Sequence, residues 1–162
     1  MKFKKTITII VIIIVLLFSM VLGGLLGAGN YSYAEKYEFS VSKDELIKAV
    51  QLLKNEKPEY NIPQVIELTD AQNNNDGYFH FYFYYQNENQ IVHFFISDSN
   101  NSSFLYLDAI NDGLTLGHWQ EVNRDFDRDN NIKVKNEFME RILNNLKLNY
   151  KDKGNGMFVF WK

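Results

Sequence analysis

The chain has 162 residues, a formal net charge of −3 and no cysteine, which excludes disulfides and a lipid-modified cysteine. Residues 1–34 hold three Lys and no acid, so the 128 residues that follow carry 14 basic and 20 acidic side chains, a formal charge of −6. Binding to nucleic-acid phosphates needs clustered Lys and Arg, whereas these basic residues are scattered among acids. Nucleic acid is therefore excluded as a partner. Richness in Asn, Lys and Ile is typical of AT-rich bacterial genomes.

The first feature along the chain is an apolar run over residues 6–28, which follows a basic flank, residues 1–5. About 20 apolar residues are enough for a helix to cross about 30 Å of hydrocarbon. Basic residues favour the cytoplasmic side, and Lys2, Lys4 and Lys5 all precede the run. The pattern predicts a single-pass protein of the cell membrane, with its N-terminus in the cytoplasm and its C-terminal domain outside.

A removable secretory signal is the alternative interpretation of this segment. Ser32-Tyr33-Ala34 has the small-x-small pattern of a cleavage site, and the protein would then be secreted after cleavage near Ala34. Signal peptides usually have an apolar region of about 7–15 residues, shorter than this run, which favours an uncleaved anchor. In either case we expect a linker over residues 29–40 and an extracytoplasmic domain over residues 41–162.

The domain is expected to begin with an amphipathic helix over residues 43–55. Ser42 and Glu45 form a capping box before it, and apolar residues follow at helical spacing. Two prolines, Pro58 and Pro63, then interrupt the pattern. A short strand is predicted over residues 64–68, before the polar turn 73–77.

Alternating aromatic residues over 78–85 give the clearest strand signal in the chain. The polar turn 86–90 predicts a hairpin, with further antiparallel strands over 91–96 and 104–110. Residues 111–131 are expected to be mostly irregular. A second amphipathic helix, ending near Tyr150, and a terminal strand over 157–161 complete the chain.

This order of elements predicts the α+β class, with an antiparallel sheet of four to five strands and two amphipathic helices on one face. Phe79, Phe81 and Phe83 would point toward the helices. Residues of the neighbouring strands would supply the same face, namely Val92, Phe94, Ile96, Leu105, Leu107 and Ala109.

The opposite face of the sheet is the first candidate site. Tyr rings bury well and keep a hydroxyl at their edge, a combination enriched where proteins dock. A Trp in the 111–131 stretch would either anchor a partner or pin its own loop to the sheet. The candidate binding residues are Tyr78, His80, Tyr82, Tyr84, His93, Tyr106 and Trp119.

An acidic run is the second candidate site, for calcium. Three aspartates at alternate positions partly match the EF-hand loop, but Asn136 stands where the pattern needs a bidentate Glu. Such residues are also typical of a solvated turn before a helix. The candidate metal ligands are Asp125, Asp127, Asp129 and Asn131.

These patterns favour a bacterial envelope protein whose exported domain binds another protein or envelope component, with no chemistry and no cofactor of its own. No nucleophile-elbow motif, glycine-rich phosphate loop or zinc-ligand spacing occurs in the chain. A small envelope hydrolase that uses the histidines, or a calcium-stabilised module, is the alternative.

Overall fold

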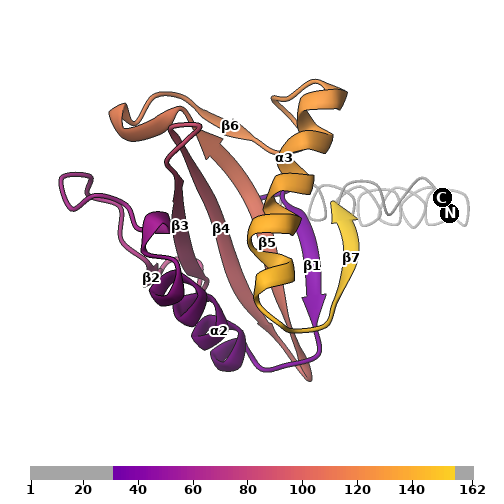
Figure 1. Ribbon diagram of the computed structural model, residues 1–162. Helices are drawn as coiled ribbons and strands as arrows, with labels where there is room; N and C mark the ends of the chain where they lie inside the picture. Colours follow the sequence, from indigo (N-terminus) through magenta and orange to yellow (C-terminus); the bar gives the residue numbers. More distant parts are fainter. Residues whose placement is uncertain (1–30, 156–162) are drawn as a thin grey trace, which may run out of the picture. The chain divides into compact units, whose positions relative to one another are not determined.

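Seven strands pair into one antiparallel sheet in the computed structural model, which describes residues 31–155 (Figure 1). The strand order is β2-β3-β4-β5-β1-β7, and β6 pairs with β5. The strands are β1 (Glu35–Phe39), β2 (Ala71–Gln72), β3 (Phe79–Tyr85), β4 (Gln90–Ser99), β5 (Ser102–Asn111), β6 (Trp119–Glu121) and β7 (Tyr150–Asn155). The helices are α2 (Lys43–Glu56) and α3 (Arg128–Arg141), with short 3-10 segments at Pro58–Tyr60, Gly113–Thr115 and Leu143–Asn145.

The predicted α+β class is confirmed, although the sheet has more strands than the four to five expected. Both helices pack into one apolar core on the same face of the sheet. Within residues 31–155, no helix has the length and apolar character needed to cross a membrane. The predicted anchor, residues 6–28, and the predicted strand at 157–161 lie outside the described residues.

The elements with strong local signals form where the sequence places them. The Ser42 hydroxyl accepts from the Glu45 amide, and the Glu45 carboxylate accepts from the Ser42 amide, so the capping box is confirmed. This box starts α2, which ends at Glu56, one residue beyond the expected end. The predicted strands at 78–85, 91–96 and 104–110 correspond to β3, β4 and β5.

Other predicted boundaries are corrected by the structure. Residues 64–68 form turns and coil instead of a strand, and the short strand β2 follows them. The sheet begins at Glu35, inside the segment 29–40 that was expected to be a linker. β1 lies between β5 and β7, where its alternate residues Tyr37 and Phe39 are buried in the core.

The second half of the chain folds more regularly than the sequence indicates. The stretch 111–131 contains β6 and the first turn of α3, which starts at Arg128 because Asp127 caps it. The helix then ends at Arg141, well before the expected end near Tyr150. Tyr150 instead begins β7, which pairs along β1.

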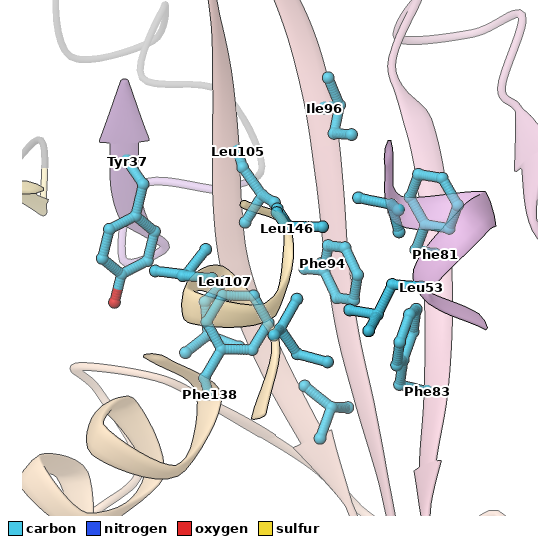
Figure 2. Close-up of a cluster of buried hydrophobic side chains, with 14 of the residues drawn as sticks. Tyr37, Leu53, Phe81, Phe83, Phe94, Ile96, Leu105, Leu107, Phe138 and Leu146 are labelled. Carbon is cyan, nitrogen blue, oxygen red and sulfur yellow. The ribbon is translucent and has the colours of Figure 1, made fainter. Parts of the chain in front are cut away.

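The core lies between the Phe face of the sheet and the two helices (Figure 2). Phe94 on β4 is fully buried near its centre, with its ring centroid 5.4 Å from that of Phe81 and 5.2 Å from that of Phe83. Its edge meets Phe138 of α3 at 5.2 Å. From α2, Leu46, Val50 and Leu53 join the same cluster. Phe94 therefore connects the sheet to the C-terminal helix.

A β-bulge on β5 changes which residues face this core. His93 pairs with Ala109 while the next residue, Phe94, pairs with Leu107, so Asp108 and Ala109 together oppose His93. Ile110 consequently belongs to the core cluster. Ala109 is buried, but it lies opposite His93, so its expected place on the Phe face is wrong. The bulge also marks the point on β5 where pairing with β1 ends and pairing with β6 begins.

Candidate functional site

The sheet face opposite the helices carries the aromatic residues that the sequence singles out. On β3 and β4, the register pairs Tyr82 with His93 and His80 with Phe95. Because side chains alternate along a strand, every second residue of β3 lies on this face, together with the residue of β4 that pairs with it. We call the following set the second face: Tyr78, His80, Tyr82, Tyr84, His93, Phe95, Phe104, Tyr106, Asp108 and Trp119.

One row of rings crosses the second face from the residue before β3 to β4 and β5. Phe95 stacks on Tyr78 with centroids 4.9 Å apart and planes 15° apart, and on Tyr106 at 4.8 Å and 11°. This spacing is the distance between neighbouring strands, so the rings stand upright on the sheet with their faces toward one another. Phe95, in the middle of the row, is fully buried, while Tyr78 and Tyr106 on either side of it are half-buried.

A second row is built around His93. Tyr82 stacks on it at 4.9 Å and 17°, and Trp119 meets it edge-on at 6.0 Å. Trp119 reaches this position because β6 pairs it with Asn111 at the end of β5. The structure therefore brings Trp119 onto the second face, where it packs against its own sheet and stays half-buried.

Two residues lie at the edges of this face. The Tyr84 hydroxyl donates to Asn89 Oδ1 at 2.9 Å, which ties Tyr84 to the β3–β4 turn, away from the stacked rows. At the β1 side, Lys36 Nζ lies 3.6 Å from the centroid of the Phe104 ring and 5.6 Å from that of Tyr106. A cation over a ring face is attracted by the ring quadrupole, so Lys36 adds positive charge to this edge.

The two histidines of the second face join two aspartates in one hydrogen-bonded chain. His80 Nδ1 lies 2.9 Å from His93 Nε2, and the two rings are stacked within 3° of parallel. At the ends, His80 Nε2 lies 3.1 Å from Asp76 Oδ2, and His93 Nδ1 lies 2.9 Å from Asp108 Oδ2. Both histidines are buried, at 7% and 8% exposure. The bulge on β5 places Asp108 opposite His93 for this contact.

All four imidazole nitrogens of this pair are engaged by neighbouring side chains. A general acid or base needs a ring nitrogen within reach of its substrate, and a metal needs a ring lone pair. Among residues 31–155, no group of three or more His, Asp or Glu side chains is arranged to hold a metal ion. In this arrangement the pair can hold and share protons with its two carboxylates.

The acidic run lies at the start of α3, where its oxygens bind the protein's own amides. Asp127 Oδ1 accepts from the Asn130 amide at 2.9 Å as the helix N-cap, and Asp125 Oδ2 accepts from the Glu121 amide at 2.8 Å. Asp129 lies in the first turn of the helix. Asn131 Oδ1 accepts from the Asn123 amide at 2.8 Å. These hydrogen bonds explain the acidic run as the N-cap of α3 and the turn before it.

Replacing Asp127 with alanine should lower the free energy of unfolding, because it removes the N-cap of α3. The hydrogen bonds from Asn130 hold the pKa of the Asp127 carboxyl below its ordinary value, so this contribution is present at neutral pH and is lost on acidification through that pKa. Urea unfolding of both proteins, with millimolar calcium and with chelator, checks this. A calcium-dependent rise in the wild-type midpoint that Asp127→Ala abolishes would instead support the metal site.

Two polar centres of the domain escape sequence analysis. The sequence does not determine the conformation of the turn that contains Asp76. Only the position of Asp76, four residues before His80, hints at the contact between the two side chains. Asn123 adopts a left-handed conformation, with φ of 65°, and its side-chain amide donates to Tyr33 O and Glu35 Oε2. It thereby ties the end of β6 to the start of β1, 88 residues apart in sequence.

Comparisons with known proteins identify no relative. No protein-family model, curated protein or solved structure matches the chain. The proposals below therefore depend on the geometry and chemistry of the second face.

Proposed function

We propose that the chain is a non-catalytic binding protein of the bacterial envelope, whose extracytoplasmic domain holds a protein partner on the second face. Residues 6–28 would anchor it as a single-pass membrane protein, or would direct its secretion. One observation carries the proposal: the helices α2 and α3 both cover one face of the sheet, while the other gathers stacked aromatic residues with half-buried tyrosines.

The orientation of the rings favours a protein over a flat ligand. A flat apolar ligand stacks on exposed ring faces, but here the faces of Phe95 and Tyr106 are turned toward their neighbours. Tyr82, Tyr106 and Trp119 are half-buried and combine a polar group with apolar carbon, and Tyr and Trp are enriched in protein interfaces for this combination. Lys36, at the β1 edge, adds a positive charge to this surface.

The same geometry disfavours the alternative of an envelope hydrolase. His80 and His93 come together as such an enzyme would need, but the contacts of each ring nitrogen are made within the domain. A substrate would have to displace a hydrogen-bonded carboxylate, of Asp76 or Asp108, to reach either ring. In our proposal, His80 and His93 have a structural role and stabilise the second face.

The test is site-specific photo-crosslinking in cells of the source organism. A photoreactive residue at Phe104, which is half-buried on the second face, should yield an adduct with one protein partner. The matched control is Leu52, which is 58% exposed on α2 and should yield no such adduct. An adduct of the Phe104 probe with the chain's own residues, or equal labelling from both positions, would contradict the proposal.

Binding of the partner identified in this way can then be measured with purified proteins. Tyr106→Phe keeps the stacked ring and removes only the hydroxyl, so we expect Kd to rise about tenfold, the loss of one hydrogen bond of about 1–1.5 kcal/mol. Leu52→Ala should leave Kd unchanged. An unchanged Kd for Tyr106→Phe and for Tyr82→Phe would place the partner elsewhere.

A further inference from the structure

The chain Asp76–His80–His93–Asp108 joins four separate parts of the domain. Asp76 belongs to the turn before β3, His80 to β3, His93 to β4 and Asp108 to the bulge of β5. The aspartate side chains are 22% and 14% exposed, and those of the histidines 9% and 10%, so the chain is largely shielded from water. The protonation state of these four side chains therefore depends on their surroundings in the fold.

Counting protons shows what this chain requires. Each of its three contacts needs one hydrogen: His80 to Asp76, His80 to His93, and His93 to Asp108. Ionised carboxylates donate none, and two neutral imidazoles carry only two N–H groups between them. All three hydrogen bonds form together only when the pair holds one additional proton, which is one imidazolium between two carboxylates.

The contacts also indicate which histidine holds that proton. His93 has the closer carboxylate, with Asp108 at 2.9 Å against 3.1 Å for Asp76 on His80, and Asp108 is the less exposed of the two acids. Burial lowers the pKa of His80, and His93 lowers it further, although Asp76 and Asp108 oppose this. A proton shared between the rings therefore resides on the His93 side.

We propose that His93 is a buried imidazolium with Asp108 as its counter-ion, and that neutral His80 accepts its Nε2–H while donating its own Nε2–H to Asp76. The proton locks the β2–β3 turn to the bulge of β5 across two strands. This inference concerns the charge state of the pair and is independent of the partner proposed above.

The lock should hold only within a range of pH. At alkaline pH the pair loses its additional proton, and one of the three contacts is left without a hydrogen. At acidic pH a second proton would set two N–H groups against each other at 2.9 Å. Because the pKa of His80 is lowered in the fold, the unfolded chain takes up that proton first, so stability falls as the pH drops through the ordinary imidazole range.

Within residues 31–155, the other side chains in ring contact with the pair are uncharged. Tyr82 on β3 stacks on His93, and burial raises the pKa of its phenol, so it stays neutral across this range. Phe95 on β4 and Trp119 on β6 contact the rings and do not ionise. Asp76 and Asp108 are the acidic side chains of the described residues that contact the pair.

The test is nitrogen NMR of the full-length protein in detergent micelles, with ¹⁵N-labelled histidine. The chain has three histidines, and exposed His118 serves as the internal reference. At pH 7.5 we expect His93 to show two protonated nitrogens and His80 a protonated Nε2 only. A His93 that is neutral at pH 7.5, or that titrates together with His118, would overturn the proposal.

Two isosteric variants separate the roles of the carboxylates. Asp108→Asn removes the counter-ion of His93, so the His93 signals should become those of a neutral ring at pH 7.5. Asp76→Asn makes the same change at His80, where the amide oxygen still accepts, and His93 should stay charged. A His93 that stays charged in Asp108→Asn would contradict the assignment. Should Asp108→Asn fail to fold, the wild-type spectra alone decide.

Discussion

Replacing Phe94 with alanine should lower the free energy of unfolding by about 3–5 kcal/mol, the range for truncation of a large buried aromatic residue. Phe94 is fully buried, and its ring contacts Phe81 and Phe83 on the neighbouring strand and Phe138 on α3. The alanine variant buries less apolar surface on folding and also loses these ring contacts. The resulting cavity borders two strands and a helix that are fixed by their own hydrogen bonds, so it can collapse only partly.

Urea unfolding followed by circular dichroism measures this loss. Phe94→Leu, which keeps most of the volume, should cost clearly less than Phe94→Ala. The matched surface control is Leu52→Ala on α2, where a side chain 58% exposed should change stability by less than about 0.5 kcal/mol. A cost below about 1.5 kcal/mol for Phe94→Ala would show that the helices do not close the core as described.

Replacing Asp70 with alanine should cost about 2–3 kcal/mol, because it removes one bond to the backbone of β3 and leaves a half-buried lysine without its counter-ion. Asp70 Oδ1 accepts from the Tyr82 amide at 2.9 Å, and Asp70 Oδ2 lies 2.6 Å from Lys54 Nζ. Lys54 in turn donates to Tyr82 O at 2.8 Å. Together the two side chains hydrogen-bond to the Tyr82 backbone at the outer edge of β3, beyond the end of the short strand β2.

Asp70→Asn separates the two contributions in the same unfolding experiment. The asparagine oxygen can still accept from the Tyr82 amide, so this variant should lose only the charge and should cost about half as much as Asp70→Ala. We also expect Asp70→Ala to self-associate more at high concentration, because it uncovers part of a strand edge. Equal stability of the alanine variant and the wild type would show that the pair contributes nothing measurable.

Local sequence patterns predict the parts of the fold that local chemistry decides. The capping box at Ser42 fixes the start of α2, and the two-residue alternation of Phe and Tyr assigns the faces of β3. The same alternation places His80, Tyr82 and His93 on one face, as the register confirms. These features depend on neighbours in sequence, or on the simplest hairpin pairing.

Long-range pairing decides the parts that sequence alone did not predict. β1 and β7 are short and rich in charged residues. β1 becomes a strand because β5 and β7 supply its hydrogen bonds, and β7 becomes one because it pairs with β1. The bulge at Asp108 breaks the alternation from which Ala109 was assigned to the core. The Asp76–His80 contact depends on the conformation of a polar turn, which carries no periodic signal.

The pairing of β1 with β7 also determines how the domain responds to mechanical load. Glu35 pairs with Asn155, so the first residue of β1 and the last described residue of β7 lie at the same end of two antiparallel strands. Tension between these two points would act perpendicular to β1 and β7. It would break the hydrogen bonds between them one after another, instead of loading all of them at once. A domain tethered at one of these points and pulled at the other would therefore release β7 under a small force while its aromatic core stayed folded.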